Sequence, residues 1–262
     1  MASSLISGLI ASGHSPSQIW VSDVNQDTLQ NLAATLNVNV SVNNDAVINE
    51  VDVVVLAVKP QILRAVAETS AALLQAKQAL VVSIAAGISQ ASLSRWIGEK
   101  VAIVRCMPNT PALVLTGATA LHANSNVSDE QRDLAENILR AVGISLWVAD
   151  ESELDIVTAV SGSGPAYYFL LMESMEKAAV EMGLSKETAR LLIQQTALGA
   201  AKIALESNES PEQLRNRVTS PGGTTQRAIE TFERGDFSLL VSKALNAAKE
   251  RSIEMSKQLG ED

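Results

Sequence analysis

The segment Ser220-Pro221-Gly222-Gly223-Thr224-Thr225 carries residue types suited to holding a small anion. Its proline fixes one φ angle, and its two glycines permit backbone conformations that other residues avoid. An apolar-periodic helix begins near Arg227, and Thr224 or Thr225 can cap it. Such a turn leaves backbone N–H groups unpaired at a helix N-terminus, where negative charge is stabilised, with the hydroxyls of Ser220, Thr224 and Thr225 beside it. The alternative interpretation is an ordinary Pro-Gly-Gly loop with a threonine cap.

Three other segments follow apolar runs that are typical of buried strands. The stretch Ala57-Val58-Lys59-Pro60 ends such a run, Ala85 lies among the small residues 83–87, and Met107-Pro108-Asn109 forms a rigid turn after the next strand. Open α/β sheets bind ligands at the carboxyl ends of their strands. Lys59 is therefore either a solvated surface residue or a contact for a bound cofactor, and the small residues either admit a flat ring or only allow tight packing.

The order of elements predicts two domains. Strands and helices alternate up to about residue 150, which favours a doubly wound parallel sheet. From Ser152 onward only long apolar-periodic helices follow, so we place a dinucleotide-binding domain at 1–150 and a helical dimerisation and substrate domain at 151–262. The predicted strands are 19–22, 38–42, 51–58, 79–84, 101–104, 118–122 and 145–148; the predicted helices of the second domain are 154–160, 165–182, 186–206, 211–217, 225–233 and 237–259.

Composition excludes several classes of function. The chain has 262 residues and a net charge of −9 without a basic cluster, which argues against nucleic acid or an anionic membrane as partner. The single cysteine fits a reducing compartment, and no apolar run reaches the length of a membrane span, so we expect a cytoplasmic protein. Cys106 has no histidine nearby to activate it, His14 and His122 fit no triad, and we expect no metal site.

The loop sequence resembles the signature of a known family. Residues 214–233 contain Val218-Thr219-Ser220, Gly222-Gly223-x-Thr225 and Ala228-Ile229, and together they resemble the signature of pyrroline-5-carboxylate reductases. The strings 105–111 and 161–167 also resemble segments of that family, and the resemblance extends from Met1 to beyond Phe232.

The resemblance implies a Rossmann-like domain, a helical dimerisation domain and an NAD(P)H-dependent oxidoreductase of proline biosynthesis. Such an enzyme transfers a hydride from NADPH or NADH to the C=N bond of 1-pyrroline-5-carboxylate and forms L-proline. It implies a homodimer, or a higher oligomer of dimers. The catalytic residues would be Thr225 and Lys59, and Ser220, Gly222, Gly223, Thr224 and Thr225 would hold the substrate. The residues implied for cofactor binding are Met1, Ala2, Asn44, Ala57, Val58, Lys59, Pro60, Ala85, Met107, Pro108 and Asn109.

Two polar positions near the adenosine end of such a cofactor have two interpretations each. Asp23 ends a predicted strand, where a carboxylate accepts hydrogen bonds from a ribose 2′-OH and repels a 2′-phosphate, which mildly favours NADH. The same residue is a plausible helix cap. Asn44 matches an adenosine-side asparagine of the family, but Asn43-Asn44-Asp45 is also typical of a simple cap.

The start of the chain differs from the family pattern. Met1-Ala2 aligns with the end of the Gly-x-Gly-x-Met-Ala stretch, so we expect that a first strand and glycine-rich turn of about eight residues belong before it. Two other functions stay open. One is a different imine or keto-acid reductase with the same two-domain plan, although a Pro-Gly-Gly-Thr-Thr loop does not fit the β-hydroxyacid type. The other is a non-catalytic cofactor-binding or helical dimer protein.

Overall fold

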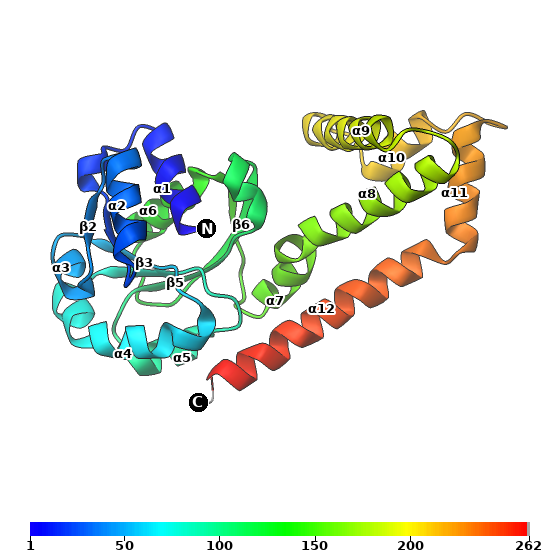
Figure 1. Ribbon diagram of the computed structural model, residues 1–262. Coiled ribbons are helices and arrows are strands. Elements are labelled where there is room, and N and C mark those ends of the chain that lie inside the picture. Colours follow the sequence, from blue (N-terminus) through cyan, green and yellow to red (C-terminus); the bar gives the residue numbers. More distant parts are fainter. Residues whose placement is uncertain (261–262) are drawn as a thin grey trace. The chain divides into compact units, whose positions relative to one another are not determined.

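The computed structural model describes residues 1–260 and contains two compact units (Figure 1). The sheet unit comprises Met1–Ser163 and the C-terminal segment from Ala247, and the helical unit comprises Gly164–Asn246. The division into domains at residue 150 stays a prediction. None of the described helices is both long and apolar enough to cross a membrane.

The sheet unit is an α/β fold, as predicted. Strands β1 (Trp20–Ser22) and β2 (Asn39–Ser41) form a parallel pair, and the other strands form one sheet in the order β3-β4-β5-β6-β7. Their bounds are β3 Val53–Leu56, β4 Leu80–Ser83, β5 Ile103–Met107, β6 Gly117–Ala123 and β7 Gly143–Trp147. Among the described residues β1 pairs only with β2, and β3 only with β4.

One strand departs from the predicted parallel arrangement. Strand β6 runs antiparallel to β5, with Arg105 opposite His122, whereas every other neighbouring pair is parallel. The short 3-10 turn η2 (Thr110–Val114) and the left-handed Leu115 join the two strands. A short connection can reverse the chain, but a parallel neighbour requires a long crossover, so the antiparallel pairing follows from the length of this connection.

Helices surround the sheet and complete the unit. They are α1 (Ala2–Ala11), η1 (Pro16–Gln18), α2 (Gln26–Leu36), α3 (Asn44–Asn49), α4 (Pro60–Lys77), α5 (Gln90–Ile97), α6 (Asp129–Arg140) and α7 (Glu153–Val157). A π-helical turn η3 (Thr158–Gly162) follows α7 without a break.

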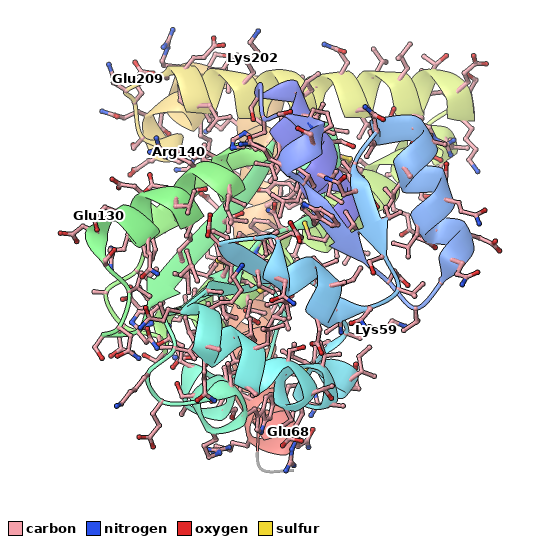
Figure 2. The ribbon with its side chains drawn as sticks, turned by 90° about the vertical axis from the view of Figure 1, so that its left-hand side faces the viewer. Lys59, Glu68, Glu130, Arg140, Lys202 and Glu209 are labelled. Carbon is pink, nitrogen blue, oxygen red and sulfur yellow. The ribbon has the colours of Figure 1, made fainter. Side chains whose placement is uncertain are left out.

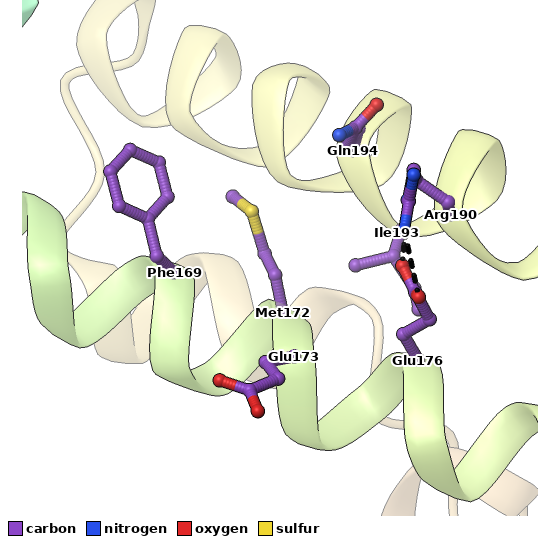
Figure 3. Close-up of a pocket in the computed structure, with 7 residues that line it drawn as sticks. All are labelled: Phe169, Met172, Glu173, Glu176, Arg190, Ile193 and Gln194. Carbon is purple, nitrogen blue, oxygen red and sulfur yellow. Dashed lines mark hydrogen bonds and ion pairs between the residues drawn. The ribbon is translucent and has the colours of Figure 1, made fainter.

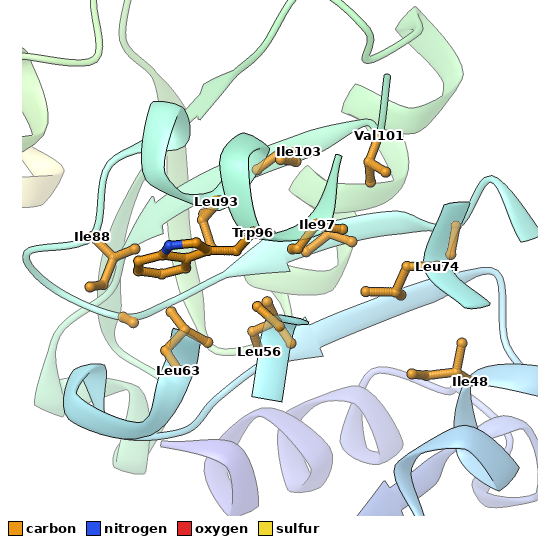
Figure 4. Packing of buried hydrophobic residues seen from close by; sticks show 14 residues of the cluster. Ile48, Leu56, Leu63, Leu74, Ile88, Leu93, Trp96, Ile97, Val101 and Ile103 are labelled. Atoms are coloured by element: carbon orange, nitrogen blue, oxygen red, sulfur yellow. The ribbon is translucent and has the colours of Figure 1, made fainter. Parts of the chain in front are cut away.

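Side chains of the apolar strands contribute to two hydrophobic clusters, one on each face of the sheet. On β4, Val81 joins the cluster beneath α4 and α5 (Figure 4), while Leu80 and Val82 join the cluster beneath α1 and α6. On β5, Ile103 and Val104 divide in the same way. Successive side chains of a strand point to opposite faces, so a strand covered on both faces is apolar throughout. This is the physical reason why these runs predict strands without showing alternation.

The helical unit contains α8 (Gly164–Glu181), α9 (Lys186–Glu206), α10 (Pro211–Arg217), α11 (Thr224–Arg234) and the first part of α12 (Phe237–Gly260). Ser185 and Ser210 cap α9 and α10 through their side chains, and Ser210 forms a capping box with Gln213. Within residues 164–246 only Gly164 and Ala189 are buried. These helices therefore have no hydrophobic core of their own in a single chain.

Candidate active site

The carboxyl ends of β3, β4 and β5 lie at one edge of the sheet because these strands are parallel. Ala57, Val58 and Lys59 follow β3, and Pro60 begins α4 directly after them. Lys59 is the N-cap residue of α4 but makes no side-chain capping bond. Its ammonium is exposed, and Figure 2 shows the side chain projecting from the surface of the sheet unit. This edge thus presents a cation whose charge is available to an anionic ligand.

The next segment on the same edge is a tight turn of small residues. Ala85 is buried, and its N–H lies 3.5 Å from Ser83 Oγ. Gly87 has φ +73°, a conformation that costs a glycine little. The last turns of α12 pack against it, because a Cβ at Gly87 would lie 3.4 Å from Met255 Cβ and 3.5 Å from Leu259 Cδ1. The C-terminal helix therefore supports the turn that contains Ala85, a contact that the sequence did not indicate.

The third segment contains Met107, Pro108 and Asn109, and its side chains are engaged within the sheet unit. Asn109 Oδ1 accepts a hydrogen bond from Ala118 N (2.9 Å), and Asn109 Nδ2 donates to Ser161 O (3.1 Å). Met107 contacts the same π-helical turn, because a Cβ at Gly162 would collide with Met107 Cε. The side chain of Asn109 thus connects the end of β5 with the turn η3 and with the start of β6.

Asp23 follows β1, and it is not the N-cap residue of α2. Asn25 occupies that position. Asn25 caps α2 by accepting from Thr28 N (3.1 Å), and Asp23 Oδ1 accepts from Asn25 N (2.8 Å). Asp23 is exposed.

After β2, too, a neighbour of the predicted cofactor residue is the helix cap. Asn43 caps α3 by accepting from Asp45 N (2.8 Å), while Asn44 is the first helical residue and is half-buried. The amide of Asn44 is not the cap, so its role toward a cofactor stays a prediction.

Met1 and Ala2 lie at the start of α1. Met1 is the N-cap residue, its carbonyl accepts from Leu5 N (3.0 Å), and both Met1 and Ala2 are exposed. Ser4, in the first turn, is buried with no hydrogen-bond partner for its Oγ within the described residues.

The substrate loop predicted from the sequence lies in the helical unit. The prediction that a threonine caps α11 is wrong: Gly223 occupies the N-cap position with extended backbone, and no side chain makes the capping bond. Gly222 adopts φ +72°, and its N–H donates to Gln226 Oε1 (2.6 Å), while Gly223 N donates to Ser220 O (3.0 Å). Within residues 1–260 the hydroxyls and N–H groups of Thr224 and Thr225 have no hydrogen-bond partner. Four donors are therefore available at the positive end of an eleven-residue helix.

A buried polar network in the sheet unit was missed by sequence reasoning. Arg105 Nη1 lies 2.7 Å from Glu151 Oε1, and the same oxygen accepts from Gln90 N (2.7 Å). Gln90 Nε2 donates to His122 O (2.8 Å), and Gln90 Oε1 lies 3.0 Å from His122 Nδ1. His122, which fits no catalytic triad in the sequence, belongs to this network. The network joins the middle of the sheet to the segment that follows β7.

Cys106 lies beside Arg105 and is not chemically active. It is buried among the cluster beneath α1 and α6, and this burial raises the pKa of its thiol far above the ordinary value. A thiol held in the protonated form is a poor nucleophile. The described residues contain no group of three or more metal-ligating side chains.

A hollow of the helical unit contains none of the predicted site residues. It lies between α8 and α9 (Figure 3), where Glu176 accepts two hydrogen bonds from Arg190 (2.9 and 3.1 Å). The lining residues are Phe169, Met172, Glu173, Glu176, Arg190, Ile193 and Gln194.

The donor set of the sheet edge fits a nicotinamide dinucleotide. Lys59 offers an exposed cation for a phosphate, and Ala85 with Gly87 a surface that a flat ring can approach. Asp23 lies after β1, in the separate β1–β2 pair. The predicted cofactor residues of β3, β4 and β5 are brought to one edge, whereas Ser220–Thr225 belongs to the helical unit.

Comparison with known proteins identifies the family. Residues 151–255 match the family model for pyrroline-5-carboxylate reductase dimerisation, and residues 1–87 match the model for NADP oxidoreductase coenzyme F420-dependent. Pyrroline-5-carboxylate reductase of Pseudomonas aeruginosa is 51% identical over 100% of this chain and 95% of its own length. The corresponding protein of Haemophilus influenzae is 43% identical, over 97% and 94%.

Solved structures give the same result. A pyrroline-5-carboxylate reductase from Coxiella burnetii superposes with a TM-score of 0.94 at 45% identity, covering 97% of this chain and 94% of that one. The Plasmodium falciparum enzyme with NADP bound superposes with a TM-score of 0.85 at 30% identity, covering 97% and 94%. The chain belongs to the pyrroline-5-carboxylate reductase family, as its loop sequence predicted.

Proposed function

We propose that this chain reduces the C=N bond of 1-pyrroline-5-carboxylate and forms L-proline, with the substrate held by Ser220–Thr225. The enzyme class follows from the family: the chain is an NAD(P)H-dependent oxidoreductase that acts on a cyclic imine. The observation that supports the proposal is the start of α11: Gly223 occupies the N-cap position without a capping bond, and within residues 1–260 the hydroxyls and N–H groups of Thr224 and Thr225 have no partner.

The roles of the loop residues follow from these free donors. The N–H groups of Thr224 and Thr225 hold the substrate carboxylate, which the N-terminus of α11 also stabilises electrostatically. Ser220 Oγ lies within the same turn and adds a neutral donor. Gly222 and Gly223 shape the turn, because Gly222 has positive φ and Gly223 lies close against Ser220.

Thr225 orients the ring nitrogen of the substrate. The bound cofactor supplies a hydride from C4 of its nicotinamide to the imine carbon. The nitrogen gains basicity as the double bond is reduced, and it takes up one proton. A threonine hydroxyl is too weak an acid to supply that proton alone at neutral pH, so Thr225 donates a hydrogen bond and relays a proton from water. Lys59 contributes a fixed positive charge near the reacting centre.

The cofactor is held by the sheet unit. Ala57, Val58, Lys59 and Pro60 line it after β3, Ala85 after β4, and Met107, Pro108 and Asn109 after β5. Asn44 contacts the adenosine side, and Met1 and Ala2 approach it from the start of α1.

The active protein is a homodimer in the cytoplasm, or an oligomer of such dimers, and the domains divide at residue 150. The chain carries the dimerisation domain of its family in residues 151–255. Side chains such as Tyr168, Phe169, Leu191 and Leu198 are exposed on α8 and α9, in a unit that buries almost nothing by itself. Apolar surface of this extent is typical of an obligate interface.

The test is the oxidation of NADH and NADPH by the purified protein with 1-pyrroline-5-carboxylate, followed at 340 nm, with chiral analysis of the proline formed. A β-keto acid serves as the control substrate. L-proline formation without reduction of the keto acid supports the proposal. Reduction of the keto acid alone would establish the other reductase class, and binding of cofactor without reduction of either would establish a non-catalytic protein.

A further inference from the structure

The first part of the sheet unit has an unusual distribution of charge. Residues 1–58, which form α1 to β3, contain no lysine or arginine. They contain five carboxylates, at Asp23, Asp27, Asp45, Glu50 and Asp52. Within residues 1–260 none of these five forms an ion pair with a basic side chain from elsewhere in the chain. The segment therefore presents uncompensated negative charge.

Asp23 places part of that charge at the carboxyl edge of the β1–β2 pair, the kind of edge at which parallel sheets bind ligands. Strands β1 and β2 are parallel, so Asp23 and Val42 follow their strands at the same edge. Val24 and Val42 are 96% and 56% exposed there, which gives an apolar surface beside the carboxylate. Within residues 1–260 only Oδ1 of Asp23 accepts a hydrogen bond, from Asn25 N, and Asn25 itself caps α2. An asparagine at position 23 would make the same local bond, so this bond does not require a negative charge there.

We propose that this chain prefers NADH to NADPH and that the carboxylate of Asp23 sets the preference. The inference rests on the proposed function, since it concerns the cofactor of that reaction. The two cofactors differ by a phosphate on the adenosine ribose. A carboxylate accepts hydrogen bonds from the 2′-hydroxyl of NADH and repels the 2′-phosphate of NADPH. No lysine or arginine in residues 1–58 offsets that repulsion.

A preference for NADH differs from the cofactor that two of the matched proteins or families carry in their names, which is NADP. The matched N-terminal family model is described as an NADP oxidoreductase, and the solved Plasmodium falciparum relative has NADP bound. Those names belong to proteins whose own residues at this edge decide their cofactor. In this chain the choice depends on the charge at Asp23 and around it.

The first experiment measures dissociation constants for NADH and NADPH from the fluorescence of the reduced nicotinamide, without substrate. We expect NADH to bind about tenfold more tightly than NADPH at low salt, and the difference to shrink as ionic strength rises. Competition by 5′-ADP and by 2′,5′-ADP repeats the comparison on the adenosine half alone. Tighter binding of NADPH, or of 2′,5′-ADP, overturns the proposal.

A matched pair of variants tests the residue. Asp23→Asn keeps the acceptor for Asn25 N but removes the charge, and we expect the NADPH-to-NADH ratio of dissociation constants to fall about tenfold. Asp52→Asn removes a charge just before the amino end of β3, outside the β1–β2 pair, and leaves the ratio unchanged. A ratio that Asp23→Asn does not change, or that both variants change equally, rules out Asp23 as its source. Adding Val24→Arg to Asp23→Asn inverts the preference.

Turnover of 1-pyrroline-5-carboxylate with each cofactor separates the two proposals. Turnover with NADPH preferred contradicts the inference alone. Tighter NADH binding without any turnover contradicts the proposed function alone. If neither cofactor binds, both fail.

Discussion

Arg105 and Glu151 form a salt bridge across the sheet unit, with Nη1 and Oε1 2.7 Å apart and the arginine side chain only 6% exposed. The arginine lies on β5, two residues before Met107, and the glutamate lies beyond β7 and also accepts from Gln90 N. The pair therefore fixes the segment leading to α7 against the start of α5 and the end of β5.

Glu151→Gln should destabilise the protein by about 3 kcal/mol, because it leaves the buried guanidinium without a counter-charge. The exposed pair Arg64–Glu68 is the control, since its side chains are 47% and 48% exposed. Glu68→Gln should cost less than about 0.5 kcal/mol. Urea unfolding of the two variants measures both effects, and equal losses would show that the buried pair contributes nothing special.

Cys106 should give the protein a specific loss of stability at alkaline pH. Burial raises the pKa of the folded thiol, so the folded state keeps its proton at a pH where the unfolded thiol, with a pKa of about 8.5, has lost it. Above that pH the unfolded state binds fewer protons, and the free energy of unfolding falls by up to about 1.4 kcal/mol per pH unit from this group.

The measurement compares wild type with Cys106→Ala by urea unfolding between pH 7 and pH 10 under reducing conditions. The alanine variant is less stable at pH 7 because it leaves a cavity, and the difference should narrow above pH 8.5. A difference that stays constant with pH would contradict the assignment.

Asn109→Asp tests the connection between β5 and the π-helical turn. The variant keeps the acceptor for Ala118 N but places a carboxylate oxygen against Ser161 O, and it should cost about 2 kcal/mol. Asn126→Asp is the control, because Asn126 Nδ2 also donates to carbonyl groups but lies at an exposed site away from this edge. We expect Asn109→Asp to raise the KM for cofactor in addition, and Asn126→Asp to leave it unchanged.

Local sequence patterns predicted those helices and strands that depend on a single local preference, such as apolar burial on both faces or helix capping. The runs forming β3 and β4 are apolar on both faces, and α10 carries its own start signal in Ser210, Pro211 and Gln213. The prediction ended this strand at Val104, but β5 continues to Met107. Arg105 is tolerated there because Glu151, 46 residues later, neutralises it, and such a partner cannot be read locally.

The candidate site was predictable in its motifs but not in its hydrogen bonds. Asn25 caps α2 and Gly223 occupies the N-cap position of α11, although the sequence also allowed Asp23 and the threonines at these positions, since several neighbouring residues satisfy the same preference. The π-helical turn Thr158–Gly162 was read as the end of an ordinary helix. Its contacts with Met107 and Asn109 come from residues about 50 positions away and leave no periodic pattern.

Gly223→Ala should weaken substrate binding. A Cβ there would lie 2.6 Å from Ser220 Oγ and 3.0 Å from Ser220 O, so the turn must shift and its N–H groups must change direction. We expect the substrate KM to rise about tenfold or more, with the dissociation constant of the cofactor unchanged. Gly235→Ala is the control at the other end of α11, where the nearest atom would be Phe232 O at 3.4 Å. An unchanged KM in Gly223→Ala would remove the loop from the substrate site.

Thr225→Ala should lower kcat by about a hundredfold to a thousandfold, the range for loss of one donor aimed at the reacting group. Thr225 is half-buried at the second position of α11, and its hydroxyl is not used for capping. Thr225→Ser keeps the hydroxyl and should retain most of kcat. Thr231→Ala is the control, because Thr231 Oγ1 donates to Arg227 O and accepts from Arg234 Nη2, both within the same helix.

Steady-state kinetics and cofactor fluorescence distinguish a catalytic role from a structural one for Thr225. A group that orients the ring nitrogen changes kcat and leaves the dissociation constant of the cofactor alone. A group that only holds the loop together raises the substrate KM, and it lowers the unfolding midpoint of Thr225→Ala as well. If Thr225→Ser lost as much kcat as Thr225→Ala, the hydroxyl could not be the operative group, and the proton would have to reach the ring nitrogen by another route.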